Sequence, residues 1–183
     1  GEDILSPERT APAVIALAPN FARAAEVKIV AKVNKWPRFL SRQKILNVDT
    51  SFFEGDYVGS CGAVIHDHRG NFITASTARL EHVAGVFTTE AAALLEGPKL
   101  AKNMGCSNLV VRSDNSTVVD AINCKEGYSM VATQVLDDCH NTLLDFGRVN
   151  IEQCSRETNY VAHELARWGR VNNPSLWVDA PPE

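Results

Sequence analysis

Three segments with the composition of β-strands follow one another between residues 44 and 80, and they constrain the fold more than any other feature of the chain. They read KILNVDTSFF, GSCGAVIHDHRG and NFITASTARL, and they are rich in β-branched and aromatic residues. The short polar turns EGD and DHRG separate them, and connections this short join antiparallel strands. We therefore expect a three-stranded antiparallel meander at the start of the domain.

Helical and strand-like segments alternate after the meander. Residues 87–105, FTTEAAALLEGPKLAKNMG, have the alanines and leucines of a helix, and Gly105 has the position of a C′ glycine. Gly97 and Pro98 predict a kink or break in this helix, since an internal proline costs about 3 kcal/mol. The remaining elements are expected as a strand at 107–114, helices at 115–123 and 130–146, a strand at 148–156 and a closing helix at 157–170. This order predicts an α/β fold with a mixed five-stranded sheet, three antiparallel strands and then two parallel ones, flanked by helices.

Length and composition limit the number of domains that the chain can form. With 183 residues and 45% hydrophobic content, it can bury one well-packed core. Residues 1–35 are rich in proline and alanine and have no sustained periodicity, so we expect a linker or N-terminal extension there. We expect a domain at 36–178 and a C-terminal tail at 179–183. The net charge of −4 excludes a strong nonspecific electrostatic attraction to nucleic acid.

Cysteine usage and hydropathy indicate the compartment. The five cysteines are widely spaced and include no CxxC pair, which is typical of core thiols in a reducing environment. The apolar segment APAVIALAP, residues 11–19, is too short to cross a bilayer. We expect an intracellular protein, cytoplasmic or nuclear, with no membrane partner. An organelle stays open, because a chain that begins at Gly1 rather than Met is expected to be a fragment.

Three acidic residues stand in unusual places. Asp49 lies mid-strand, where a buried carboxylate is costly unless it is paired or binds a metal; an edge or strand-end position is the less favoured alternative. Glu90 falls on the apolar face of its helix, with a first-turn or capping-box role as the alternative. Asp114 ends a buried strand, where an N-cap is ordinary and where ligand sites of α/β sheets also gather.

His163 lies in ETNYVAHELARWGR, residues 157–170, at the edge of the apolar stripe of an amphipathic helix. A half-exposed rim histidine is the simpler interpretation, and a metal ligand or proton carrier needs partners elsewhere in the chain. The three carboxylates could converge on one point only by binding a cation, and hard oxygen ligands suit Mg²⁺ or Mn²⁺. The chemistry of such a set is phosphodiester hydrolysis with two metal ions.

The order of these residues resembles the ribonuclease H fold. In detail it is similar to the plant ribonuclease H-like domains of retroelement-type reverse transcriptases and of stand-alone genes. The resemblance spans about residues 36 to 177, and it rests on NVDTSF, CGAVIHDHRG, TTEAAAL, VVRSDN and RETNYVAHELA. It implies three acidic metal ligands, with a histidine at the position of the fourth acidic ligand. The catalytic and metal-binding residues that it implies are Asp49, Glu90, Asp114 and His163.

Two functions from different classes follow from this resemblance. The first is an endoribonuclease that uses Mg²⁺ or Mn²⁺ to cut the RNA strand of RNA/DNA hybrids. The second is a catalytically weak or inactive module of a larger plant protein, which binds nucleic acid or a protein partner. His163 favours the second, because imidazole is neutral and a poorer match for Mg²⁺ than a carboxylate. His66 and Asn115 also stand at positions where the plant ribonuclease H-like domains usually have Arg and Ser. A third alternative takes the acidic residues as unrelated structural residues.

Neighbouring polar residues receive simpler interpretations. His66, His68 and Arg69 are expected in a solvated hairpin turn. Asn159 is a candidate N-cap of the last helix, and Arg156 is a candidate partner for a phosphate or a carboxylate.

Overall fold

The computed structural model describes residues 43–53, 57–81, 83, 85–124 and 130–181. The predicted linker at 1–35 lies outside these residues, as does the start of the predicted domain up to residue 42. No helix in the described part is long and apolar enough to cross a membrane. The described strands are β1 (Lys44–Phe53), β2 (Val58–Asp67), β3 (Phe72–Leu80), β4 (Asn108–Ser113), β5 (Arg148–Gln153) and β6 (Ser175–Val178). The described helices are α3 (Val86–Asn103), α4 (Ser116–Cys124), α5 (Met130–Leu143) and α6 (Arg156–Val171).

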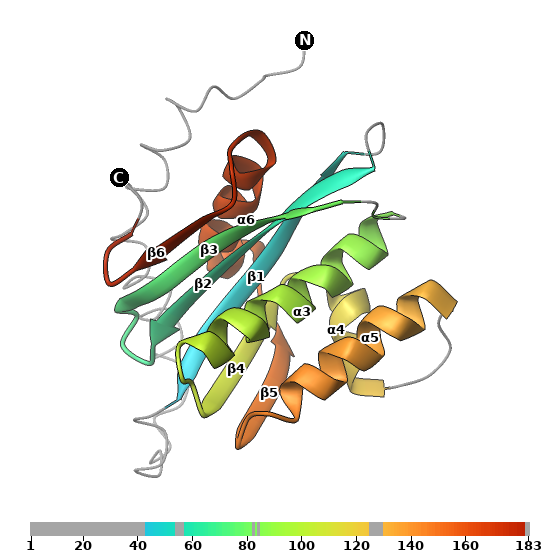
Figure 1. Ribbon diagram of the computed structural model, residues 1–183. Helices are drawn as coiled ribbons and strands as arrows, with labels where there is room; N and C mark the ends of the chain where they lie inside the picture. The colour runs from blue at the N-terminus through green and yellow to red at the C-terminus, as the bar shows by residue number, and fades with distance from the viewer. Residues whose placement is uncertain (1–42, 54–56, 82, 84, 125–129, 182–183) are drawn as a thin grey trace.

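The strands form one mixed sheet in the order β5-β4-β1-β2-β3-β6 (Figure 1). β1, β2 and β3 pair antiparallel, whereas β4 and β5 extend the sheet from β1 in parallel. The predicted meander and its two parallel additions are therefore confirmed. β6 was not predicted; it pairs antiparallel with β3, so the sheet has six strands rather than five.

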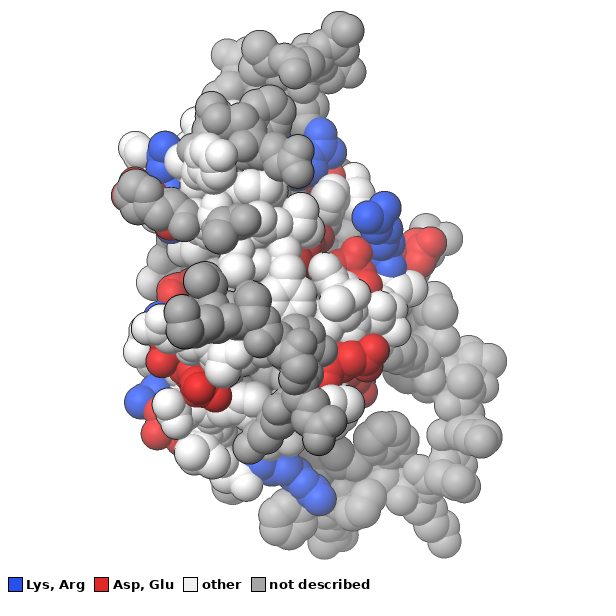
Figure 2. All heavy atoms as spheres, turned by 90° about the vertical axis from the view of Figure 1, so that its right-hand side faces the viewer, with Lys and Arg blue, Asp and Glu red and all other residues white. Residues whose placement is uncertain are grey.

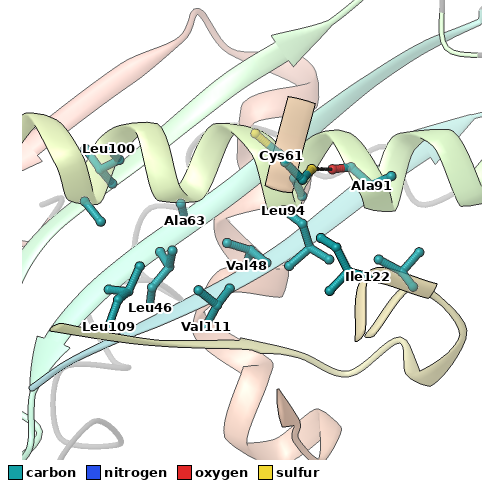
Figure 3. Close-up of a cluster of buried hydrophobic side chains, with 14 of the residues drawn as sticks. Leu46, Val48, Cys61, Ala63, Ala91, Leu94, Leu100, Leu109, Val111 and Ile122 are labelled. Atoms are coloured by element: carbon teal, nitrogen blue, oxygen red, sulfur yellow. Dashed lines mark hydrogen bonds between the residues drawn. The ribbon is translucent and has the colours of Figure 1, made fainter. Parts of the chain in front are cut away.

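Helices cover both faces of the sheet, with α3, α4 and α5 on one face and α6 on the other (Figure 1). The alternation of side chains along β1 divides its residues between these two layers. Leu46 and Val48 lie with Leu94 of α3 in the larger core cluster (Figure 3). Asn47 and Asp49 point the other way and contact residues of α6. A central strand thus presents apolar groups to one layer and polar groups to the other.

α3 runs unbroken from Val86 to Asn103 although it contains Pro98, so the helix does not break there, and the kink stays a prediction. Gly97 and Pro98 are both buried, and a side chain at Gly97 would collide with Val48 of β1. Close packing on the sheet therefore outweighs the local cost of the proline. The predicted C′ glycine is confirmed, since Gly105 has a φ of 69° and its N–H donates to the carbonyl of Lys102.

α6 lies directly on β2. A side chain at Gly62 would collide with the backbone of α6 at Ala162 and Ala166, and the hydroxyl of Ser60 donates to the carbonyl of Ala166. Leu165 joins the smaller core cluster between this helix and the sheet. These contacts fix the depth and register of the helix that carries His163.

Candidate active site

Asp49 lies in the middle of β1 on the α6 side of the sheet and is 4% exposed. Its Oδ1 accepts a hydrogen bond from the backbone N–H of Thr50 at 2.7 Å, and its Oδ2 pairs with Nδ1 of His163 at 2.9 Å. Both oxygens are therefore paired, as a buried carboxylate requires. The alternative of an edge or strand-end residue is wrong, because β1 lies between β4 and β2 and Asp49 lies inside it.

Glu90 approaches the same region from α3. Burial raises the pKa of its carboxyl group and the negative charge of Asp49 raises it further, so that the pKa reaches about 7 instead of 4.5. Hydrogen bonds from the side chains of Thr50 and Asn115 oppose this shift, and the charge of Asp114 adds to it. Glu90 therefore interacts electrostatically with the carboxylates of Asp49 and Asp114.

The capping alternatives for the two outer carboxylates are wrong. α3 follows Gly85 at its N-cap, and its first turn contains no acidic residue, so Glu90 is not a capping group. α4 is capped by Asn115, whose Oδ1 accepts from the backbone N–H of Val118 at 3.2 Å. Neither Glu90 nor Asp114 is thus needed to cap a helix.

Two residues of α6 hold the carboxylate of Asp114. Nε of Arg156 donates to Oδ2 at 3.3 Å, and Nδ2 of Asn159 donates to Oδ1 at 3.4 Å. The expected pairing of Arg156 with a carboxylate is therefore confirmed. Its side chain is 91% exposed, and exposed ion pairs contribute only about 0–1 kcal/mol to stability, so this pair mainly orients Asp114.

His163 projects from α6 with a side chain that is 46% exposed. Its hydrogen bond to Asp49 raises the pKa of the imidazole, and partial burial opposes that shift. The structure thus brings His163 to the carboxylate that the sequence assigned to the same site. It does so through a direct hydrogen bond between the two side chains.

Asn159 is a buried residue inside α6 rather than its N-cap, so that prediction is wrong. Ser155 caps the helix by accepting from the backbone N–H of Thr158 at 3.3 Å. Asn159 is 1% exposed, donates from Nδ2 to the carbonyl of Val48 at 2.9 Å, and accepts at Oδ1 from Nδ2 of Asn47 at 3.1 Å. It therefore joins α6 to β1 beside the carboxylates.

His66 is buried, contrary to the expectation of a solvated turn residue. Its Nδ1 lies 2.8 Å from the carbonyl oxygen of Asp67, and its Nε2 lies 3.3 Å from Oδ1 of Asn47. Burial lowers the pKa of the imidazole. The expectation failed because β2 extends to Asp67, which leaves His66 on an inward-facing strand position.

Spacing could have indicated the buried asparagines. Asn47 stands two residues before Asp49 and so shares its face of the strand, and Asn159 stands four residues before His163 and shares its face of the helix. Thr50 gives no comparable signal, because a threonine in a strand is ordinary.

The donor set fits a hard divalent cation. Three carboxylates supply the oxygen ligands that Mg²⁺ and Mn²⁺ prefer, and a cation between them would relieve the repulsion that raises the pKa of Glu90. Among the residues that the structure describes, no group of three or more His, Cys, Asp and Glu side chains is arranged so that it could hold a metal ion as it stands.

The face shown in Figure 2 offers nucleic acid little electrostatic attraction on its described part. On the face shown in Figure 2, acidic and basic side chains are scattered over a largely uncharged surface, and the coloured part has no continuous basic patch. The net charge of the chain is −4. Any contact with a phosphate backbone on this face would have to be local.

The sequence family described as "Reverse transcriptase-like" matches residues 47–169, which include all four predicted site residues. The chain belongs to this family. The matched region of this reverse transcriptase-like domain covers most of the sheet and ends within α6. No curated protein matches the chain significantly.

Solved structures confirm a ribonuclease H-like fold for this family member. The N-terminal RNase H domain of Rv2228c from Mycobacterium tuberculosis is 19% identical with a TM-score of 0.62, over 69% of this chain and 91% of that one. RNase H1 from the halophilic archaeon Halobacterium salinarum NRC-1 is 17% identical with a TM-score of 0.63, over 68% and 94% of the two chains. LC11-RNase H1 in complex with an RNA/DNA hybrid is 18% identical with a TM-score of 0.60, over 67% and 92%. At these identities the similarity establishes the fold.

Proposed function

We propose that this domain binds RNA/DNA hybrids and hydrolyses their RNA strand in a reaction that depends on Mg²⁺ or Mn²⁺. One observation carries the proposal: the carboxylates of Asp49 in β1 and of Asp114 after β4 both interact with Glu90 of α3 and raise its pKa. Carboxylates that raise the pKa of a neighbouring carboxyl group are unfavourable unless a cation joins them, so this interaction points to a functional site. A solved protein of the same fold is known with an RNA/DNA hybrid, which supports the substrate class.

Asp49, Glu90 and Asp114 would hold the metal ions, with His163 as the fourth group of the site. Bound divalent ions supply a water-derived nucleophile at neutral pH and neutralise charge at the scissile phosphate. The chain's own residues prepare this site: the N–H of Thr50 fixes Oδ1 of Asp49, and α6 orients Asp114. With a pKa of about 7, the carboxyl group of Glu90 is partly protonated at neutral pH and can release that proton when a cation approaches.

A second candidate is a binding module with weak or no catalysis. The distance of 2.9 Å between Nδ1 of His163 and Oδ2 of Asp49 favours it, because the histidine occupies an oxygen that a metal would need. Arg156 likewise provides Asp114 with a positive partner. In this case the domain would bind nucleic acid, or a protein partner of a larger polypeptide, with its acidic cluster already paired internally.

Cleavage of an end-labelled RNA/DNA hybrid separates these functions. The wild type, Asp49→Asn and the control Asp145→Asn are compared in Mg²⁺ and in Mn²⁺, with hybrid binding measured in parallel. Asp145→Asn is a suitable control because it removes the same charge as Asp49→Asn. Asp145 pairs with Lys102 at the surface, away from the site. We expect cleavage by the wild type and the control but not by Asp49→Asn. Hybrid binding without cleavage in either metal would establish the binding module instead.

The thiols support an intracellular location, which we also propose. All five cysteines are free, and burial raises the pKa of Cys61 and Cys139 to about 12. Such thiols are unreactive and consistent with a reducing compartment.

A further inference from the structure

Two parallel contacts join β1 to α6. Asn47 and Asp49 lie two residues apart on β1, a spacing of about 6.8 Å along a strand. Asn159 and His163 lie four residues apart on α6, a rise of about 6 Å along a helix. Because these spacings nearly match, Asn159 can contact Asn47 while His163 contacts Asp49. Asn159 and His163 therefore face β1 side by side, one helical turn apart.

Asn159 also links this pair of elements to Asp114. Its two amide hydrogens have two acceptors, the carbonyl of Val48 at 2.9 Å and Oδ1 of Asp114 at 3.4 Å, while its own oxygen accepts from Asn47 at 3.1 Å. The opposite amide orientation would set its oxygen against the carbonyl of Val48 and its NH₂ against the NH₂ of Asn47. The surrounding groups therefore fix the orientation of this amide.

We propose that Asn159 is a positioning residue of the metal site, which holds Asp114 and α6 in place beside β1. The inference rests on the proposed function, because it assigns a role at the same carboxylates. Asn159 touches the backbone of β1, a side chain of β1 and the carboxylate that follows β4, so one buried amide sets the relative positions of three site elements. Residues that orient metal ligands in this way typically account for about 10- to 100-fold in metal affinity.

A purely structural role would be the competing explanation, and Asn47 provides the matched control. Asn47→Ala and Asn159→Ala each cut the same hydrogen bond between two buried residues. Only Asn159→Ala also removes the contact with Asp114. Both variants are expected to lower the melting temperature, whereas only Asn159→Ala is expected to weaken metal binding.

The test is the thermal denaturation of the full 183-residue chain during titration with Mn²⁺. Wild type, Asp49→Asn, Asn47→Ala and Asn159→Ala are compared, with Asn159→Ser as a substitute if the alanine variant does not fold. We expect the half-saturating Mn²⁺ concentration to rise about 10- to 100-fold in Asn159→Ala and to stay unchanged in Asn47→Ala.

Two results would overturn the inference, and they differ in what else they overturn. In the first case, Mn²⁺ stabilises the wild type but not Asp49→Asn, while the two asparagine variants keep the wild-type affinity for Mn²⁺ or lose it to the same extent. Asn159 is then structural, and the proposed function stands. If the wild type shows no stabilisation by Mn²⁺, the metal site of the proposed function and the role of Asn159 fail together.

Discussion

Replacing Glu90 with glutamine should stabilise the metal-free protein above neutral pH. The folded-state pKa of Glu90, about 7, lies above its ordinary value of 4.5. A carboxyl group shifted in this direction contributes stability that is fully present below pH 4.5 and is lost as the pH rises through 7. Glutamine stays neutral and keeps polar atoms for Thr50 and Asn115, so the variant should escape this loss.

The size of the effect follows from the pKa difference. A difference of about 2.5 between the folded and ordinary values corresponds to about 3 kcal/mol, since one pKa unit is worth about 1.4 kcal/mol. The free energy of unfolding of the wild type should therefore fall by about 3 kcal/mol relative to Glu90→Gln between pH 4.5 and 8. This is a large fraction of the stability of a single domain.

Urea denaturation in EDTA across this pH range measures the difference in free energy of unfolding between the wild type and Glu90→Gln. Glu96→Gln is the matched control, because Glu96 lies on the same helix and pairs with Lys99 at the surface. The difference in free energy of unfolding between Glu96→Gln and the wild type should depend little on pH. Adding Asp49→Asn to both the wild type and Glu90→Gln should shrink the pH-dependent difference, because the charge of Asp49 is one of its causes. A difference between wild type and Glu90→Gln that does not change with pH would refute the convergence of the carboxylates.

Three further predictions concern the site and the packing around it. His163→Gln should remove a stabilisation that is fully present below pH 6.5 and disappears as the pH rises through the raised pKa of the imidazole; pH-dependent denaturation in EDTA tests this, and an unchanged pH profile would show that the pair with Asp49 does not form. Gly97→Ala should destabilise by about 1–3 kcal/mol because the added methyl group collides with Val48, although alanine favours helices; a higher melting temperature would contradict this packing. Ser155→Ala should cost about 1 kcal/mol through the lost cap of α6, with urea denaturation as the measurement and no loss as the opposing result.

The sequence predicted those parts of the fold that depend on local periodicity. Five strands, their antiparallel and parallel order, and the mid-strand position of Asp49 follow from alternation and segment order. β6 was missed because a strand of four residues, SLWV, has too few positions to show an alternation, and its pairing with β3 defines it. The unbroken α3 was missed for a related reason, since the packing of Gly97 on Val48 is a long-range contact.

The residues of the candidate site were predicted from their types and positions, whereas the hydrogen bonds between them were not. Burial of an acid in a strand gave Asp49, and position along the chain gave Asp114. The partner of each carboxylate depends on how α6 lies across β1, which the close approach at Gly62 determines. His66 and Asn159 were misjudged because each was assigned by its place in the chain, to a turn and to a cap, while the fold buries both.

The enzyme and the binding module differ mainly at α6. This helix supplies a partner to Asp49 and to Asp114, whereas the contacts that lower the pKa of Glu90 come from the neutral side chains of Thr50 and Asn115. The variant His163→Asp tests whether α6 favours the enzyme or the binding module. It removes the hydrogen bond to Asp49 and adds a fourth carboxylate, so the metal-free protein should become less stable while divalent cations should bind more tightly.

Metal-dependent thermal denaturation of His163→Asp and wild type measures both effects. Repulsion among four carboxylates should lower the melting temperature in EDTA, and added Mg²⁺ should restore it at a lower concentration than the wild type needs. His163→Asn is the control, since it removes the imidazole without adding charge. If His163→Asp binds Mg²⁺ no better than His163→Asn, the residue at this position does not face the metal. The histidine would then act only as the hydrogen-bonding partner of Asp49, and the interpretation of the domain as a binding module would gain support.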